Sequence, residues 1–134
     1  MKRLVLVLAC AALFAPAALA AHHDVTPVKV VTAPKLGKIV ADTKGLALYA
    51  WNRERDGKIR CTGACAKQWP PLLVMKGDMV ARHVKGVMGT LGTVTRPDGH
   101  VQVTLNHRPL YTYHADTRTK ILCNGVDGWF VVKA

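Results

Sequence analysis

The stretch LYAWNRE, residues 48–54, returns later in the chain as LYTYHAD, residues 110–116. Cys61 and Cys123 each lie twelve residues after the first tyrosine of their copy. Two copies of a unit that is too small to bury a core alone indicate a fold built from tandem repeats. The repeats extend over about residues 38–72 and 100–133, and a tryptophan stands near the end of each, Trp69 and Trp129.

Around the repeated stretches the pattern is that of short strands between polar turns. Asp42-Thr43-Lys44-Gly45 and Arg96-Pro97-Asp98-Gly99 have the residue types of tight turns. In residues 101–105, apolar side chains alternate with Gln102 and Thr104, which is the pattern of a half-buried strand. We therefore predict a mainly β domain over residues 35–134, with antiparallel strands from two tandem pseudo-repeats and one or two short helices. A leader over residues 21–34, with an edge strand around 28–31, precedes it.

Two short helices are expected between the repeats. Thr62 is the expected cap of a helix through residues 63–68, which Trp69-Pro70-Pro71 must end. A second helix is expected from Asp78 to Lys85, with Gly86 as its stop.

Residues 1–20 have the composition of a secretory signal peptide. Two basic residues precede an apolar run over residues 4–19, and Ala18-Leu19-Ala20 is a small-x-small cleavage site. This predicts cleavage after Ala20 and a periplasmic or secreted mature chain. Lipid anchoring at Cys10 is the lesser alternative, because the apolar region before it would be shorter than the usual ~7–15 residues.

The chain is strongly basic, with a formal net charge of +11. Loss of Lys2 and Arg3 with the signal peptide leaves +9. Such a charge favours anionic neighbours, for example membrane headgroups or surface polysaccharide. The bases are scattered and no nucleic-acid-binding motif accompanies them, so we expect no specific nucleic-acid recognition. No transmembrane segment is expected after signal removal.

Cys61, Cys65 and Cys123 remain in the mature chain, and an exported protein with three cysteines is expected to form one disulfide. The segment CTGACAKQWPP, residues 61–71, has neither the C-x-x-C-H spacing of a c-type haem site nor the C-x-x-C of a thioredoxin-like site. An oxidising compartment disfavours a thiolate metal site. We interpret the cysteines as a structural staple.

The repeated stretches resemble the bacterial secreted or lipoprotein repeat named for its Y-x-[FWY]-x-x-D motif, a family of unknown function. The second copy, from Tyr111 to Asp116, fits the motif in full, whereas the first has Glu54 at the acidic position. Cys61 and Cys65 followed by WPPL are also typical of the family's first repeat. The resemblance implies an exported protein and a Cys61–Cys65 disulfide. Cys123 is the rival partner for either cysteine, and Cys61–Cys123 is the pairing that the repeat symmetry favours. It implies no reaction.

The motif side chains allow two interpretations. In a strand, the two aromatic residues of each copy point to the same face. They form either a packed core with the acid capping a turn, or a shelf for a ring or sugar ligand with a carboxylate at its rim. Packing is the weightier interpretation, because buried aromatic residues mostly serve packing. The set comprises Tyr49, Trp51, Glu54, Trp69, Tyr111, Tyr113, Asp116 and Trp129.

No cofactor is expected, and copper is the candidate to be tested. Met75, Met79 and His83 are four residues apart and would share one face if residues 75–83 were helical. Thioether and imidazole together suit Cu(I), although a small apolar face is the commoner role of such residues. Cleavage after Ala20 would also expose Ala21-His22-His23, whose amine, amides and imidazole suit Cu(II) or Ni(II).

The sequence has no recognisable catalytic constellation. It contains no serine, and no nucleophile–base pair stands out. We therefore expect an exported, non-enzymatic repeat protein that acts as a binding or envelope-associated module for an anionic envelope component or a small ligand. The alternative is a periplasmic copper-binding or thiol-redox protein.

Overall fold

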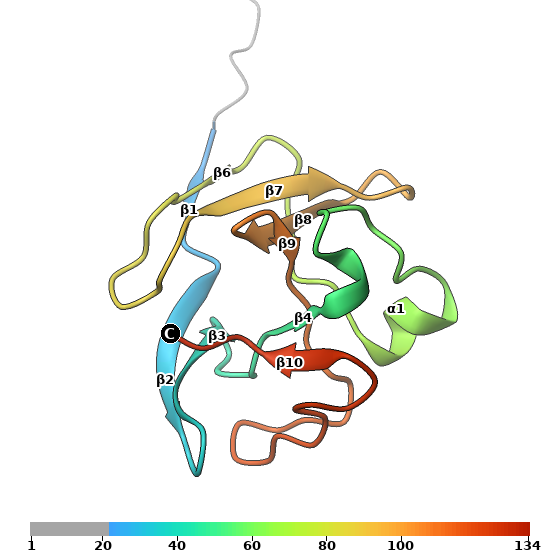
Figure 1. The fold of residues 1–134 in the computed structure, drawn as a ribbon. Helices are drawn as coiled ribbons and strands as arrows, with labels where there is room; N and C mark the ends of the chain where they lie inside the picture. The colour runs from blue at the N-terminus through green and yellow to red at the C-terminus, as the bar shows by residue number, and fades with distance from the viewer. Residues whose placement is uncertain (1–21) are drawn as a thin grey trace, which may run out of the picture.

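The computed structural model describes residues 22–134 and is mainly β, which confirms the predicted fold class (Figure 1). The signal peptide expected over residues 1–20, Cys10 and Ala21 lie outside the described residues. The strands are β1 (Asp24–Val25), β2 (Val28–Ala33), β3 (Gly37–Asp42), β4 (Tyr49–Trp51), β5 (Leu73–Val74), β6 (Met79–Val80), β7 (Leu91–Thr95), β8 (Val101–Leu105), β9 (Arg108–Pro109) and β10 (Trp129–Val131). The helical segments are the 3-10 helix η1 (Asn52–Glu54) and α1 (Ala64–Gln68).

An antiparallel hairpin precedes the motif tyrosine of each repeat, and the first strand of each hairpin lies before the predicted start of that repeat. β2 pairs with β3 ahead of Tyr49, and β7 pairs with β8 ahead of Tyr111. The predicted turn over residues 42–45 is present, with the Gly45 amide donating to the Asp42 carbonyl at 3.0 Å. β2 lies within residues 21–34, the segment expected as a leader, and pairs with β3 from Val28 to Ala33.

The two repeats meet at their tyrosines. The Tyr49 amide donates to the Tyr111 carbonyl at 2.8 Å, and the Tyr111 amide donates to the Tyr49 carbonyl at 3.0 Å. β10, the last strand of the second repeat, pairs with β4 of the first repeat, beside it in Figure 1. The amide of Val132, just after β10, also donates to the Leu48 carbonyl at 2.8 Å. Neither repeat therefore completes its backbone pairing without the other.

The interior has an aromatic and an aliphatic cluster. The aromatic cluster holds the motif tyrosines and tryptophans together with Ile39, Val131 and Cys61. The aliphatic cluster packs β2 and β3 against β8 through side chains that include Val28, Val40 and Val103. Since apolar burial is the dominant favourable contribution to folding, both clusters hold the repeats together.

The helix expected over residues 63–68 is confirmed as α1, but its predicted cap is wrong. Gly63 occupies the N-cap position with φ of 56°, and no side chain caps the helix. A positive φ is readily adopted by glycine and rarely by other residues, so the backbone enters the helix at Gly63 and not at Thr62.

The helix expected from Asp78 to Lys85 is not formed. The Met79 amide donates to the His23 carbonyl and the Ala81 amide to the Val25 carbonyl, each at 2.9 Å. β6 thus pairs in parallel with β1. These amides are engaged by a segment far away in the sequence, which local helix propensity cannot anticipate.

Candidate functional site

The motif acids bind the tyrosines of the opposite repeat. The Tyr49 hydroxyl donates to Asp116 Oδ2 at 2.6 Å, and the Tyr111 hydroxyl donates to Glu54 Oε2 at 2.8 Å. Both tyrosines are 0% exposed. Glu54, which stands where the motif has Asp, therefore keeps the hydrogen bond to tyrosine, because either carboxylate accepts from a phenol.

The second oxygen of each acid closes the loop that follows the motif. Glu54 Oε1 accepts from the amides of Arg60 at 2.6 Å and Cys61 at 2.9 Å. Asp116 Oδ1 accepts from the Leu122 amide at 2.9 Å. Each carboxylate is thus satisfied within the fold, as buried charged groups generally must be.

Burial and these hydrogen bonds stabilise the protonated tyrosines. Burial is the main cause that raises the pKa of the Tyr49 hydroxyl, followed by its bond to Asp116. Burial is also the main cause that raises the pKa of the Tyr111 hydroxyl, and the charge of Glu54 raises it further. Both hydroxyls therefore remain hydrogen-bond donors across the physiological pH range.

Four motif rings form a stack across the repeats. The rings of Trp69 and Trp129 stack with centroids 3.9 Å apart and planes 6° from parallel. Trp51 stacks on Trp129 with centroids 4.9 Å apart, and Tyr113 packs on Trp69 at 4.7 Å. Trp69 and Trp129 are 7% and 3% exposed, and the outer two rings are half-buried.

The structure thus brings the eight motif residues together, with the geometry of a packed core. Tyr49 and Tyr111 meet the edges of Trp69 and Trp129, each with centroids 5.1 Å apart. Edge-to-face and stacked rings are the arrangements that aromatic side chains favour. The only motif rings that reach the surface are those of Trp51 and Tyr113, and the Arg53 guanidinium lies 5.4 Å over the Trp51 ring.

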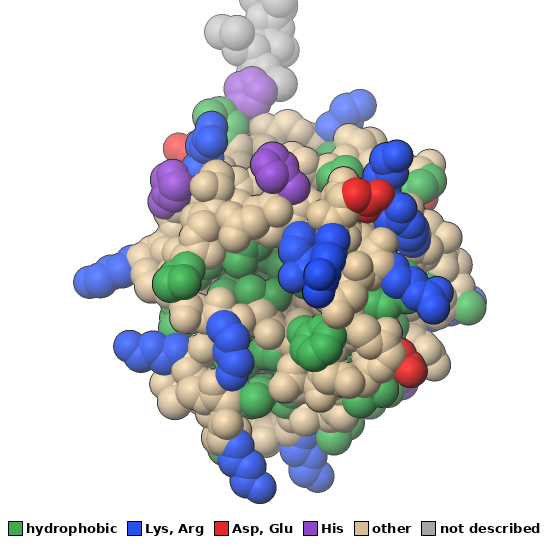
Figure 2. Space-filling view, in the orientation of Figure 1, with side chains coloured by type: hydrophobic (Ala, Val, Ile, Leu, Met, Phe, Trp, Pro, Cys, Tyr) green, Lys and Arg blue, Asp and Glu red, His purple; other side chains and the backbone are tan. Residues whose placement is uncertain are grey.

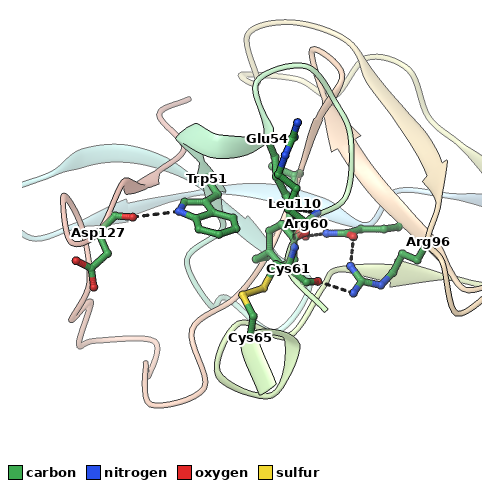
Figure 3. The surroundings of a disulfide bond; sticks show 10 residues. Trp51, Glu54, Arg60, Cys61, Cys65, Arg96, Leu110 and Asp127 are labelled. Atoms are coloured by element: carbon green, nitrogen blue, oxygen red, sulfur yellow. Dashed lines mark hydrogen bonds between the residues drawn. A yellow bond between two sulfur atoms is a disulfide. The ribbon is translucent and has the colours of Figure 1, made fainter. Parts of the chain in front are cut away.

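The Cys61–Cys65 disulfide is present, with an S–S distance of 1.98 Å (Figure 3). Cys123 is the free cysteine among the described residues, so its rival pairing with Cys61 is not formed. Cys123 is half-buried against the aromatic cluster. The neighbouring Cys123 thiol is the main cause that raises the pKa of the Tyr113 hydroxyl.

Two buried polar residues behind the disulfide were not predicted from the sequence. Arg96 is 3% exposed and donates to the Cys61 carbonyl at 2.8 Å and to Gln102 Oε1 at 2.5 Å (Figure 3). Gln102, 0% exposed, donates in turn to the Leu110 carbonyl at 2.8 Å. The alternation in residues 101–105 carries no sign of this burial, because the disulfide loop that meets Arg96 belongs to the other repeat.

The copper candidates are only partly brought together. Because residues 75–83 are not helical, Met75, Met79 and His83 do not share a helix face. Pairing of β1 with β6 instead brings His22 and His23 to the segment that carries the two methionines. His22 Nδ1 lies 2.9 Å from the Gly77 carbonyl oxygen, and the side chains of Met75 and Met79 are 72% and 56% exposed.

Within residues 22–134, no group of three or more His, Cys, Asp or Glu side chains could hold a metal ion. Across the same residues, the structure contains no helix that is both long and apolar enough to cross a membrane.

Comparison with known proteins identifies the repeats. A family model described as a secreted repeat of unknown function matches residues 30–73 and 92–133, more than half of the chain. Neither the curated proteins nor the solved structures gave a match. The matched segments contain most of each hairpin and both motif tyrosines, which meet across the repeat junction. The chain therefore belongs to the family of secreted repeats of unknown function.

Proposed function

We propose that the protein is exported by its signal peptide, is cleaved after Ala20 and acts as a non-enzymatic module that binds anionic components of the cell envelope. The observation that carries this proposal is the placement of charge. Three of the eight acids, Asp42, Glu54 and Asp116, are buried and accept hydrogen bonds from the fold itself. They offer little negative charge to the surface.

The basic side chains are mostly left without counter-charges. Within residues 22–134, only two Lys or Arg side chains lie in ion pairs, Arg60 with Asp56 and Arg96 with Asp98. Figure 2 shows basic side chains spread over one face, with few acidic ones among them. A surface with such an excess attracts anions and is sensitive to salt, because exposed charges are screened over about 8 Å at physiological ionic strength.

The environment of the free thiol supports a non-enzymatic role. Cys123 is half-buried beside Tyr113, and the raised pKa of this phenol keeps it protonated near neutral pH, so it does not take up the thiol proton. A nucleophilic cysteine is usually activated by a histidine or another cation.

Binding to vesicles tests the proposal. We expect the mature protein to co-sediment with vesicles that contain phosphatidylglycerol, not with vesicles of phosphatidylcholine alone, and to be released as salt rises. Duplex DNA should show only weak binding without sequence preference. Equal partition to both kinds of vesicle would contradict the proposal.

Copper binding is a second candidate function, and the β1–β6 pairing favours it. A carbonyl oxygen only accepts, so His22 Nδ1 carries the proton in its contact with Gly77. This leaves Nε2 free, and histidines that bind metals commonly donate their other ring N–H in this way. Exposed thioethers of Met75 and Met79 flank Gly77 in sequence and would supply soft ligands for Cu(I).

The copper candidate is tested by titrating Cu(I) under reducing conditions into the mature protein and into the Met75→Leu/Met79→Leu variant. Met88→Leu is the matched control, because Met88 is 76% exposed and lies outside the β1–β6 pair. Loss of stoichiometric binding in the double variant alone would support the site. Equal binding of Cu(I) by all three proteins would exclude Met75 and Met79 as its ligands.

A further inference from the structure

A hollow of about 400 Å³ lies between residues 132–133, which follow β10, and the β8–β9 hairpin. Figure 2 shows a hollow on this face with apolar side chains at its bottom and basic ones around it. Its floor is apolar and its rim carries two bases. The floor comprises Ala50, Leu105, Leu110 and Val132, and the rim bases are Arg108 and Lys133. Among residues 22–134, no acidic side chain lines the hollow.

The rim bases have only neutral partners. Arg108 Nη2 donates to Asn52 Oδ1 at 3.2 Å, while its Nε is buried and has no hydrogen-bond partner among the described residues. The Lys133 ammonium donates to the Leu36 carbonyl. A shielded guanidinium without an anion is costly, and burial together with the charge of nearby Arg55 lowers the pKa of Arg108. An anionic group at the rim would relieve this cost.

The wall opposite residues 132–133 is held in place before any ligand binds. Asn106 and His107 form the tight β8–β9 turn with φ of 49° and 65°. Asn106 Oδ1 accepts from the Thr90 amide at 2.9 Å and thereby fixes the preceding loop. A Cβ on Gly89 would lie 2.3 Å from Asn106 Oδ1, so only glycine permits this approach. A preformed pocket loses less entropy on binding.

We propose that this pocket binds an alkyl carboxylate, with the alkyl chain on the apolar floor and the carboxylate against Arg108 and Lys133. The inference rests on the proposed function, because it names a ligand class for the anion-binding module. A volume of about 400 Å³ is within the range of small-molecule sites, and an apolar floor with a few polar groups is their usual composition. A guanidinium is well matched to a carboxylate, since it donates two parallel hydrogen bonds.

Calorimetric titration of the mature protein with decanoate, octanoate, 1-octanol and octylammonium tests the proposal below micelle-forming concentrations. Decanoate should bind about fifteenfold more tightly than octanoate, since each of its two additional methylenes strengthens binding about fourfold when buried. Octanol should bind about tenfold more weakly than octanoate, because it lacks the charge-assisted bonds. Octylammonium should not bind. Equal affinity for octanoate and octanol would overturn the assignment of the rim bases.

Two variants locate the site. Met88→Glu places a negative charge on the pocket lining at a side chain that is 76% exposed, and should weaken decanoate binding about tenfold. Met75→Glu, at a 72% exposed methionine outside the lining, is the matched control and should bind as the unaltered protein does. Arg108→Gln should weaken the binding of decanoate and leave the binding of octanol unchanged. If Arg108→Gln does not fold, the comparison of Met88→Glu with Met75→Glu still decides whether decanoate binds in this pocket.

The vesicle assay separates this inference from the general function. Unaltered binding of decanoate to Met88→Glu, or no binding to any protein, would refute the pocket even if anionic vesicles are still bound. Decanoate binding that depends on Met88 and Arg108, without any preference for anionic vesicles, would support the pocket and refute the wider surface interaction.

Discussion

The hydrogen bonds between a tyrosine of one repeat and an acid of the other lead to a quantitative prediction about coupling. Tyr49→Phe removes one hydroxyl and leaves Asp116 Oδ2 without its 2.6 Å partner in a buried site. A hydrogen bond to a charged group contributes about 1.5–3 kcal/mol, so we expect the free energy of unfolding to fall by about 2 kcal/mol. Asp116→Asn should lower the free energy of unfolding by at least as much, because the Leu122 amide also donates to this carboxylate.

The decisive quantity is the coupling energy in two double-mutant cycles. Tyr49→Phe with Asp116→Asn, from opposite repeats, should show a coupling of about 1–2 kcal/mol, because the two side chains share one bond. Tyr49→Phe with Glu54→Gln, both from the first repeat, should be additive within about 0.5 kcal/mol, since Glu54 binds Tyr111 instead.

Urea denaturation followed by tryptophan fluorescence measures all the variants, and equal m-values would show that their unfolded states are comparable. A loss of 2 kcal/mol corresponds to a fall in Tm of roughly 8 °C or more in a domain of this size. A stronger coupling of Tyr49 to Glu54 than to Asp116 would refute the exchange of acids between repeats. In the reciprocal cycles, Tyr111→Phe should be coupled to Glu54→Gln and additive with Asp116→Asn.

Three further predictions concern pH, the disulfide and the free thiol. Because burial raises the pKa of Tyr49 and Tyr111, the folded state keeps these protons above about pH 10, where the unfolded chain loses them. These two groups should therefore leave the urea midpoint unchanged below about pH 10 and lower it above that pH. If the midpoint of the Tyr49→Phe/Tyr111→Phe variant falls as steeply above pH 10, the two tyrosines are not the cause. Removing the disulfide in Cys61→Ala/Cys65→Ala should cost about 2 kcal/mol in the chain-entropy model, since the loop is short. Intact mass after alkylation of the unfolded, unreduced mature protein should show one labelled thiol, Cys123, and three labels would exclude the bridge.

Several features of the fold could be predicted because they depend on residues close in sequence. The turns at residues 42–45 and 96–99 form as expected, the latter closed by the Gly99 amide donating to the Arg96 carbonyl at 2.9 Å. Tight turns need little beyond their own residue types, so local pattern is sufficient for them. The Cys61–Cys65 bridge was implied by the resemblance to the family, because the residues alone left Cys61–Cys123 open.

Features that depend on distant partners could not be predicted. The amide of Met79 is engaged by the His23 carbonyl, and the helix expected there is absent. Gln102 has a polar position in the alternating pattern, yet it is 0% exposed because Arg96 and the disulfide loop cover it. In each case the deciding contact comes from a segment that the local sequence does not contain.

The sequence by itself determined the two repeats, the mainly β character and the residues of the aromatic motif. Only the tertiary structure decided that Tyr49 binds Asp116 and Tyr111 binds Glu54, across the repeats rather than within them. It also decided that an apolar hollow lies beside Val132 and Lys133, with Arg108 at its rim, whose Nε has no hydrogen-bond partner among the described residues. The physical reason is that a repeat too small to bury its own polar and aromatic groups must satisfy them in its neighbour, and the pattern of one repeat does not specify how two repeats dock.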